Sequence, residues 1–361
     1  MTVAVIGAGV AGLAAAWELS RAGADVTVLE SERRPGGVVV TEREGGFVAE
    51  GGPDGWLAAE PHIPPLAQEL GIAGHIVRQV ARGSLLWTGS TFERLEEGRA
   101  AALLGIEARL EDVKAGFASF AGGMGELTDA LAAPLGGRIK MPLGVTGIAQ
   151  AGGTWRLAVT GGMVIDADAV VLALPVYSAA RLLEAAGVSG ARDLAEVAYF
   201  PSLSVSLAYQ ESQIGRGLEG TGYVTPPEGD GVIRAVTFAS RKFPGRAPAG
   251  HVLLRAFLAP VEGEPAIVAH QELRGVLALT GEPLWARTFF WSRGIPRYPR
   301  GHAARVAEVR QRLERLPPLA IAGAGVDGTG VSACVKSGRE AAQVVLRRLT
   351  FPVPPSPSRW P

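Results

Sequence analysis

The stretch VAVIGAGVAGLAAAWELSRAGADVTVLE, Val3 to Glu30, is apolar, contains three glycines and ends on a carboxylate. A signal peptide needs a basic start, and a membrane span needs an uninterrupted apolar run. No Lys or Arg precedes Val3, and glycines and charges interrupt the run, so neither is expected. The spacing of apolar residues instead predicts a strand over residues 3–6, a helix over 11–22 and a second strand over 25–29.

The residue types within this stretch are those of a dinucleotide-binding turn. Gly7 permits a sharp turn, Gly9 lets the backbone approach a pyrophosphate, and Gly12 lets the helix pack on the strand. The helix start presents N–H groups to anionic oxygens. Glu30 is about 20 residues further on, where a carboxylate accepts hydrogen bonds from ribose hydroxyls. A βαβ unit that binds a dinucleotide is therefore predicted, with a merely tight strand-helix junction as the alternative.

Composition limits the remaining possibilities. A chain of 361 residues that is 47% hydrophobic and 19% charged can form two domains with sizeable cores. Its formal net charge of +0 argues against a nucleic-acid partner. Cys334 is the only cysteine, which excludes an internal disulfide and a cysteine-based zinc cluster. The five histidines lack ligand spacing, so no metal is expected.

The residues after Glu30 distinguish between dinucleotides. The run ESERRPGGVVVTEREGGFVAEGGPDGW places a basic residue and a glycine pair after the acid, and then a second glycine pair followed by proline. This run resembles the flavin-containing amine oxidase superfamily, which implies FAD as the cofactor. A solvated Arg-Arg turn followed by a glycine loop is the alternative.

Five further blocks, in order, resemble one branch of that superfamily, the protoporphyrinogen and coproporphyrinogen oxidases of haem biosynthesis. They are EGGPDGWLAAEPHIPPLAQELGIAGHIV, FAGGMGELTDALAAPLG, VTFASRKFPGRAPAGHVLLRAFL, WSRGIPRYPRGHAARV and LAIAGAGVDGTGVSACVKSGREAA. The resemblance covers nearly the whole chain and implies FAD bound without a covalent link. It implies cofactor contacts at Gly7, Gly9, Val10, Ala11, Gly12, Glu30, Ser31, Arg34, Gly36, Gly37, Gly52, Pro53, Val145, Ala173, Trp291, Gly323, Ala324, Gly330 and Val331.

The resemblance also implies where some of these residues lie against FAD. Gly52 and Pro53 would approach the isoalloxazine edge, and Val145 and Ala173 the adenine end. A plain core strand is the alternative for Val145. The last block itself predicts a strand over 319–322, a glycine-rich loop and a helix over 332–346. The positive end of that helix would stabilise negative charge at the flavin pyrimidine, where the family match puts the Val331 N–H.

The predicted fold is α/β. A Rossmann-like FAD-binding domain, of GR2 type with p-hydroxybenzoate hydroxylase-like topology, is assigned to residues 1–56, 122–182 and 296–348. A discontinuous α+β substrate domain, built on a mixed sheet, is assigned to 57–121 and 183–295, with a Pro-rich tail over 349–361. Alternating patterns over 203–209, 232–239 and 252–258 suit strands of a sheet with one covered face.

The chain also departs from the family. Those oxidases carry a long helical domain that contacts membrane, whereas here only about two dozen residues separate LLWTGSTFERL from FASFAGGMGEL. The one helical candidate there, residues 101–117, is net acidic and would be repelled by anionic lipid, so membrane association is unlikely and a cytoplasmic location is expected. Arg82 is the nearest candidate for binding a substrate carboxylate, although it is out of register. Ala324 replaces the usual asparagine of the last block.

The resemblance implies an FAD-dependent oxidase that removes hydride from a porphyrinogen, either protoporphyrinogen IX or coproporphyrinogen III, with molecular oxygen as acceptor. No Ser/His/Asp or paired-carboxylate constellation stands out, as expected when the flavin supplies the chemistry. A flavin amine oxidase is one alternative, although Lys242 lies in SRKFPGR, a block that matches the porphyrinogen enzymes. A non-catalytic flavin-binding protein is the other. The expected partners are a small-molecule substrate and oxygen, with the chain as a monomer or homodimer.

Overall fold

The computed structural model describes residues 1–103, 109–226, 228, 229 and 231–350. The chain forms two compact units. The first comprises Met1–Gly37, Thr128–Ala198 and Pro296–Pro361, and the second comprises Val38–Leu127 and Tyr199–Ile295. No helix in the described ranges is both long enough and apolar enough to cross a bilayer.

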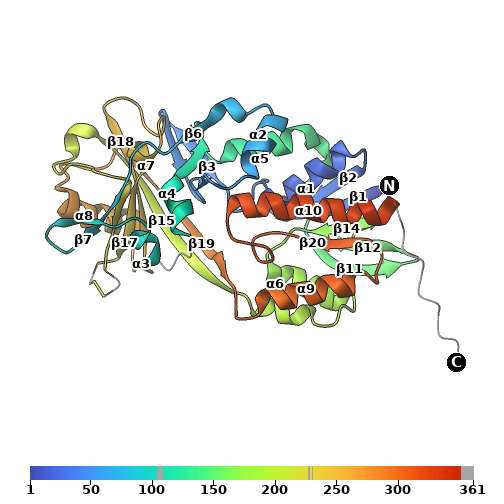
Figure 1. The fold of residues 1–361 in the computed structure, drawn as a ribbon. Helices are drawn as coiled ribbons and strands as arrows, with labels where there is room; N and C mark the ends of the chain where they lie inside the picture. The colour runs from blue at the N-terminus through green and yellow to red at the C-terminus, as the bar shows by residue number, and fades with distance from the viewer. Residues whose placement is uncertain (104–108, 227, 230, 351–361) are drawn as a thin grey trace. The chain divides into compact units, whose positions relative to one another are not determined.

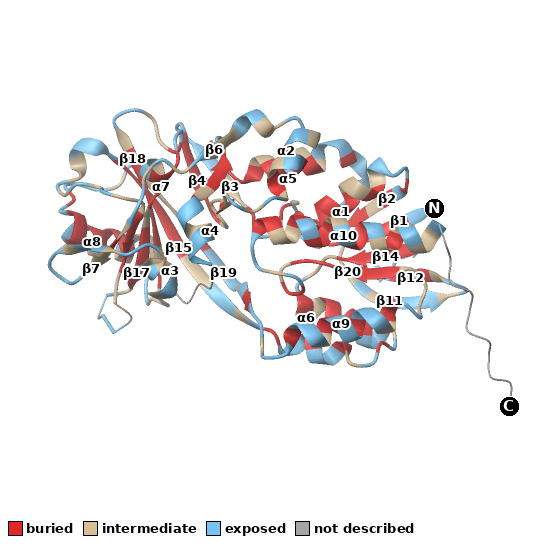
Figure 2. Ribbon diagram, in the orientation of Figure 1, coloured by how far each residue is buried: buried red, intermediate tan, exposed pale blue. Residues whose placement is uncertain are grey.

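The first unit is built on a five-stranded parallel sheet with the order β10-β2-β1-β14-β20. Its strands are β1 (Thr2–Ile6), β2 (Asp25–Leu29), β10 (Ile139–Lys140), β14 (Ala169–Leu172) and β20 (Leu319–Ile321). The central strands β1 and β14 are apolar and buried almost throughout, as is usual for a parallel sheet covered on both faces (Figure 2). The predicted strands at 3–6, 25–29 and 319–322 are confirmed.

Both faces of this sheet are covered. Helices α1 (Val10–Arg21) and α10 (Val331–Thr350) pack together on one face, and the antiparallel sheet β11-β12-β13 contacts the other face (Figure 1). The remaining elements of the unit are β11 (Val145–Ala151), β12 (Thr154–Val159), β13 (Val164–Ala167), α6 (Val176–Ala185), α9 (His302–Leu313) and the 3-10 helices Ala133–Arg138 and Ala191–Glu196. The helices predicted after both glycine loops are confirmed as α1 and α10. Helix α10 continues to Thr350, one residue into the predicted tail, and residues 351–361 lie outside the described part.

The second unit is built on a seven-stranded sheet with the order β19-β15-β18-β17-β16-β7-β8. The pair β16 and β7 is parallel, whereas β15, β18, β17 and β16 pair antiparallel, so the sheet is mixed as predicted. Its strands are β7 (Ser84–Trp87), β8 (Phe92–Leu95), β15 (Ala198–Gln210), β16 (Gly222–Val224), β17 (Ile233–Phe238), β18 (His251–Leu258) and β19 (Trp285–Arg297).

Smaller elements surround this sheet. They are the hairpin β3 (Thr41–Glu44) and β4 (Phe47–Glu50), the sheet β5 (Trp56–Leu57), β9 (Phe117–Phe120) and β6 (Ile76–Arg78), the helices α2 (Ile63–Glu69), α3 (Arg99–Leu103), α4 (Leu110–Ala115), α7 (Ala239–Lys242) and α8 (Pro265–Leu277), and the 3-10 helices Ala73–His75 and Glu211–Gln213. Helix α5 (Gly125–Ala132) crosses the boundary between the units.

The large sheet is covered on both faces, so the predicted single covered face is wrong. On one face, side chains such as Leu207 and Leu254 pack with Leu273 of α8. On the other face several of the alternate side chains are polar but equally buried: Ser204 is 1% exposed and Arg255 6% exposed. Polar alternation here reflects side chains paired with one another inside the protein rather than contact with water.

The unit boundaries differ from the predicted domain limits. Residues 38–56 were assigned to the FAD-binding domain, but they belong to the second unit. The physical reason is the packing of hairpin β3–β4, whose Phe47 and Ala49 share a core cluster with Ala208 and Leu253 of the large sheet. Residues 122–127 likewise belong to the second unit. Residues 183–198 belong to the first unit, because the 3-10 helix Ala191–Glu196 packs on α6 and α9.

The single helix predicted over residues 101–117 is not formed. Two short helices, α3 and α4, occupy this stretch, and α4 ends at Gly116, which has a φ of +78°. Leu110 is 50% exposed, so it does not contribute to a packed apolar face. Residues 104–108 of this predicted helix lie outside the described part.

Candidate functional site

The predicted glycine turn lies between β1 and α1. Gly7 has a φ of +102°, and its N–H donates to the carbonyl of Leu29 at 2.8 Å. A Cβ atom on Gly7 would lie 2.4 Å from the carbonyl oxygen of Ala173, and a Cβ on Gly12 would lie 1.9 Å from that of Gly7. Any larger residue at Gly7 or Gly12 would therefore displace the backbone.

Gly9 differs from these two glycines because its missing side chain faces open space. A Cβ atom there would meet nothing within 4 Å. Gly9 is also the N-cap of α1 and has no side chain that could satisfy the N–H groups of the first turn at Val10 and Ala11. An open turn against a helix N-terminus is suited to an anionic ligand such as a pyrophosphate.

Glu30 directly follows β2 and lies against this turn. It is 8% exposed, and its carboxylate accepts hydrogen bonds from the N–H of Ala8 at 2.7 Å and the N–H of Glu32 at 2.8 Å. The hydroxyl of Ser31 donates to it at 3.2 Å. The carboxylate thus orders the turn, and since each of its oxygens carries two lone pairs, it retains capacity for further donors.

The glycine pair predicted to follow the acid packs against the same turn. The N–H of Gly36 donates to the carbonyl of Ala8 at 2.8 Å, and a Cβ on Gly37 would lie 3.3 Å from the Cα of Gly9. Arg34 is exposed, and one guanidinium nitrogen donates to the carbonyl of Gly37 at 2.6 Å. The structure therefore brings both glycine groups together.

Val145 and Ala173 also lie beside this region. Val145 is the first residue of β11, and the segment before it reaches the acid, since the N–H of Leu143 donates to the carbonyl of Glu30 at 2.6 Å. Ala173 directly follows β14, and its N–H donates to the carbonyl of Ile6 at 2.9 Å. Ala173 thus lies beside the first glycine turn, and the segment before Val145 lies beside Glu30.

The last glycine-rich loop lies near the start of α1. A Cβ on Gly323 would come within 3.8 Å of the Cβ of Ala11. The N–H of Gly323 donates to the hydroxyl of Ser337 at 2.9 Å, and this hydroxyl donates to Asp327 at 2.5 Å. The hydroxyl of Tyr298 donates to the carbonyl of Ala324.

This loop leads into α10. Gly330 immediately precedes the helix, and its carbonyl accepts a hydrogen bond from the N–H of Cys334 at 3.0 Å. Val331 is the first residue of the helix, as its predicted role requires. The open turn, the buried carboxylate, the pair Gly36 and Gly37 and the last loop are together compatible with a bound dinucleotide.

The second unit holds the other predicted residues. A Cβ on Gly52 would lie 1.9 Å from the carbonyl oxygen of Val38, so this position requires glycine. Pro53, the next residue, has intermediate exposure. The indole N–H of Trp291 donates to the carbonyl of Gly51 at 2.7 Å.

Arg82 is engaged with the protein itself. One nitrogen of its exposed guanidinium donates to the carbonyl of Lys114 at 2.8 Å, near the C-terminus of α4, where a cation is favoured. Its role in binding a substrate carboxylate stays a prediction.

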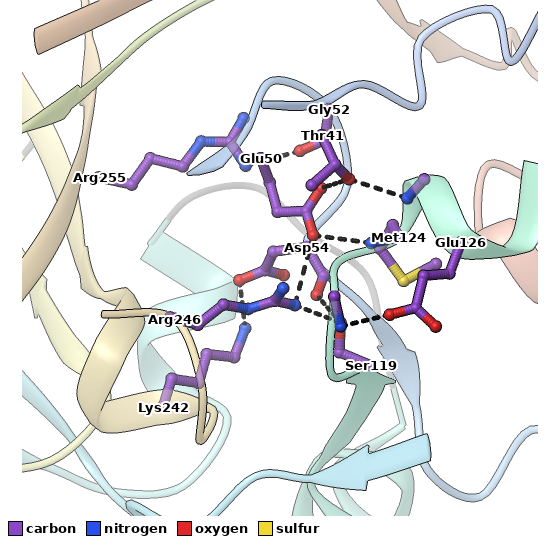
Figure 3. A network of polar contacts seen from close by, with 12 residues as sticks. Thr41, Glu50, Gly52, Asp54, Ser119, Met124, Glu126, Lys242, Arg246 and Arg255 are labelled. Carbon is purple, nitrogen blue, oxygen red and sulfur yellow. Dashed lines mark hydrogen bonds and ion pairs between the residues drawn. The ribbon is translucent and has the colours of Figure 1, made fainter. Parts of the chain in front are cut away.

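The sequence analysis missed a group of charged side chains inside the second unit, which we call the buried charge cluster: Glu50, Asp54, Lys242, Arg246 and Arg255 (Figure 3). Lys242 binds Asp54 at 2.8 Å, and Arg246 binds Glu50 at 3.3 Å. The side chains of Arg246 and Glu50 are only 2% and 4% exposed. The signal in the sequence was a charge inside an otherwise apolar strand, as in HVLLRAFL and FVAE.

Burial and pairing act differently on the two carboxyl groups of the cluster. Burial raises the pKa of Glu50, and the Arg246 charge and hydrogen bonds from Thr41 and Met124 only partly oppose it. Burial also acts to raise the pKa of Asp54, but the charge and hydrogen bond of Lys242 outweigh it and hold this pKa below its usual range. The charged residues Glu50, Asp54, Arg246 and Arg255, together with Ser206, line a cavity of about 10 Å³, close to the volume that one water needs.

Known proteins resemble this chain over most of its length. The sequence model of the family described as flavin containing amine oxidoreductase matches residues 10–93 and 74–346. Coproporphyrinogen III oxidase of Propionibacterium freudenreichii subsp. freudenreichii is 27% identical, with 98% of this chain and 92% of the relative covered. The enzyme of the same name from Bacillus subtilis (strain 168) is 22% identical, with 96% and 98% covered.

A solved structure shows the same fold. It is that of a candidate protoporphyrinogen oxidase from Exiguobacterium sp. 255-15, with a TM-score of 0.80, 23% identity, and 96% of this chain and 99% of that chain covered. The alignment with the Propionibacterium enzyme extends over 493 positions, whereas this chain has 361 residues. That alignment therefore includes many positions with no counterpart in this chain.

Proposed function

Since this chain belongs to the flavin-containing amine oxidoreductase family and is an FAD-dependent oxidoreductase, we propose that it oxidises a porphyrinogen, either coproporphyrinogen III or protoporphyrinogen IX. In each two-electron step a hydride and a proton leave the substrate, and molecular oxygen takes up both electrons and becomes hydrogen peroxide. The observation that carries this proposal is the similarity to coproporphyrinogen III oxidases over nearly the whole of both chains.

In this proposal the first unit holds FAD without a covalent bond. The turn from Gly7 to Gly12 binds the pyrophosphate at the start of α1, and Glu30 accepts hydrogen bonds from the ribose. Val145 and Ala173 lie at the adenine end, and the Val331 N–H lies at the flavin pyrimidine. Support comes from the open space at Gly9 and the buried position of Glu30. FAD supplies the redox chemistry when bound.

The contribution of the protein is then position, exclusion of water and electrostatics. The N-terminus of α10, a helix of 20 residues, carries a partial positive charge, which stabilises negative charge that develops nearby. Gly52 and Pro53 line the isoalloxazine edge in this proposal, which requires the backbone of their loop to be held in one conformation.

The position of Lys242 favours a porphyrinogen over an amine. An amine oxidase of this superfamily sets a lysine near the flavin through a water. Here the Lys242 ammonium is 2.8 Å from the Asp54 carboxylate and lies over the rings of Phe117 and Phe243. It is thus engaged in the interior of the second unit.

The test is anaerobic stopped-flow mixing of the FAD-loaded protein with each porphyrinogen and, separately, with a primary amine. We expect a porphyrinogen to bleach the flavin absorbance, and hydrogen peroxide to form once air is admitted. Free FAD at the same concentration controls for spontaneous oxidation of the substrate. Bleaching by the amine alone would support the amine oxidase alternative, and bleaching by no substrate would support a non-catalytic flavin-binding protein.

Two finer assignments belong to the same proposal. We assign the first unit to the GR2 type with p-hydroxybenzoate hydroxylase-like topology, supported by its parallel sheet between a helical layer and a three-stranded antiparallel sheet. We also propose a cytoplasmic location, supported by the net acidic charge of residues 101–117. Recovery of the protein mainly in the membrane pellet of a detergent-free lysate would contradict that location.

A further inference from the structure

The backbone of the loop Gly51–Asp54 is tied to the large sheet of the second unit by side chains that come from far along the chain. The indole N–H of Trp291, in β19, donates to the carbonyl of Gly51 at 2.7 Å. The carbonyl of the next residue, Gly52, accepts a hydrogen bond at 2.6 Å from the guanidinium of Arg255, in β18 (Figure 3).

The fourth residue of the loop is held twice. The Asp54 carboxylate accepts a hydrogen bond from Lys242 at 2.8 Å, and the Asp54 carbonyl accepts one from the hydroxyl of Ser119 at 2.7 Å. Ser119 is itself fixed, because it accepts a hydrogen bond from Arg246 at 2.6 Å. Main-chain or side-chain atoms of Gly51, Gly52 and Asp54 thus each have a partner outside the loop.

The guanidinium of Arg255 is held in place from its other side. Its Nε and Nη2 donate to the hydroxyl of Ser204 at 3.3 and 3.1 Å, and its Cζ lies 4.7 Å from the centre of the Phe257 ring. Arg255 is 6% exposed, so its orientation is set by these contacts and not by water. The planar fork of arginine suits this task, since it bridges two acceptors in fixed directions.

The charge balance of the cluster argues for a role beyond stability. Three buried cations, Lys242, Arg246 and Arg255, face two carboxylates, Glu50 and Asp54. Burying charged groups costs several kcal/mol per ion, and apolar replacements of similar volume are often as stable. A buried cationic excess that binds one loop is therefore better explained by the precise position that it gives to that loop.

We propose that Arg255, with Lys242, is a positioning residue that fixes the backbone of Gly52 and Pro53 for the flavin. This inference rests on the proposed function, in which these two residues line the isoalloxazine edge. Neither cation needs to touch the substrate. Each acts through the loop, which sets the distance between the loop backbone and the flavin edge and excludes water from that edge.

The test compares FAD-loaded Arg255→Met with wild type and with Arg234→Met. Arg234 lies in the neighbouring strand β17 and donates to the carbonyl of Gly229 at 3.3 Å, so its replacement is a matched control that leaves the loop untouched. We expect Arg255→Met to retain FAD but to lower the midpoint potential of the flavin and to change its visible absorption band. We expect flavin bleaching by porphyrinogen to slow on the order of 100-fold. Lys242→Met should act in the same direction.

Conservative variants separate position from overall folding. Arg255→Lys keeps the charge and one donor and should recover part of both the potential and the rate, and Ser204→Ala should give a smaller shift of the same sign. If Arg255→Met yields no folded FAD-loaded protein, these two variants decide the question. Wild-type potential and spectrum in the FAD-loaded variants would overturn the proposal.

The flavin readouts need no substrate. If no porphyrinogen bleaches the wild-type flavin while the variants still shift the potential, the proposed substrate is wrong and the positioning role stands.

Discussion

Glu30 combines two tasks in one side chain. Its carboxylate accepts hydrogen bonds from the N–H groups of Ala8 and Glu32, which orders the turn before any ligand binds. In the proposed site it also accepts hydrogen bonds from the FAD ribose, for which the remaining lone pairs of its oxygens suffice. A loss of Glu30 should therefore affect cofactor binding in two ways, through lost ribose contacts and through a less ordered turn.

We predict that Glu30→Ala weakens FAD binding by about 1–3 kcal/mol, the range for losing hydrogen bonds to a charged group. Titration of the apoprotein with FAD, followed by flavin fluorescence, measures this change. Glu32→Ala is the control, because Glu32 is exposed and contributes only its backbone N–H to the turn. Equal affinities for Glu30→Ala and wild type would count against Glu30 as the ribose ligand.

Glu50 predicts a specific pH dependence of stability. Because burial raises its pKa in the folded protein above the ordinary value of 4.5, the folded state holds this proton more tightly than the unfolded state. The free energy of unfolding should therefore fall as pH rises from that ordinary value through the raised pKa. In Glu50→Gln this decline should be absent, since the side chain cannot ionise.

Denaturant unfolding of wild type and Glu50→Gln across the mildly acidic to neutral range tests this expectation. The unfolding free energy of wild type should fall relative to that of Glu50→Gln as pH rises. A constant difference over the range would show that Glu50 does not titrate as its burial requires.

At the scale of elements, the crossing of α1 and α10 depends on one missing side chain. A Cβ on Gly338, within α10, would lie only 2.0 Å from the carbonyl oxygen of Ala11 in the first turn of α1. The two helices can therefore approach closely only with glycine at this position. Because both helices begin at loops of the proposed cofactor site, their approach also sets where those loops lie.

We predict that Gly338→Ala destabilises the protein by about 1–3 kcal/mol, as overpacking does, and weakens FAD binding. The matched control is Gly275→Ala in the exposed part of α8, where a Cβ would meet nothing within 4 Å. That variant should gain up to about 1 kcal/mol from the higher helix propensity of alanine. Thermal unfolding and FAD titration measure both effects, and a stabilised Gly338→Ala would contradict the tight crossing.

At the scale of the whole molecule, we predict that FAD is released without breaking a covalent bond. The resemblance to porphyrinogen oxidases motivates this expectation. Acid precipitation should leave a colourless pellet and a supernatant with the absorption spectrum of free FAD, at one FAD per chain. Flavin that stays with the pellet would indicate a covalent link, and a nicotinamide dinucleotide in the supernatant would overturn the cofactor assignment.

The amino-acid sequence alone determined the β1–α1–β2 unit, both glycine loops and the helix of the last block. Each of these follows from short-range chemistry: glycine allows the φ of Gly7, an apolar run forms a buried strand, and helix spacing shows within a few turns. The same local patterns predicted that the glycines at 7–12 and the acid at 30 belong to one site, and the family resemblance added the glycines at 36–37.

Only the tertiary structure decided the buried charge cluster and the second face of the large sheet. The five residues Glu50, Asp54, Lys242, Arg246 and Arg255 lie up to about 200 residues apart in the chain, so no local pattern shows that they form one cluster. The alternation of Ser204 and Arg255 with apolar residues looks the same whether a strand faces water or a buried polar network. The physical reason is that periodicity reports which side chains share a face, whereas their partners across that face are set by packing between distant segments.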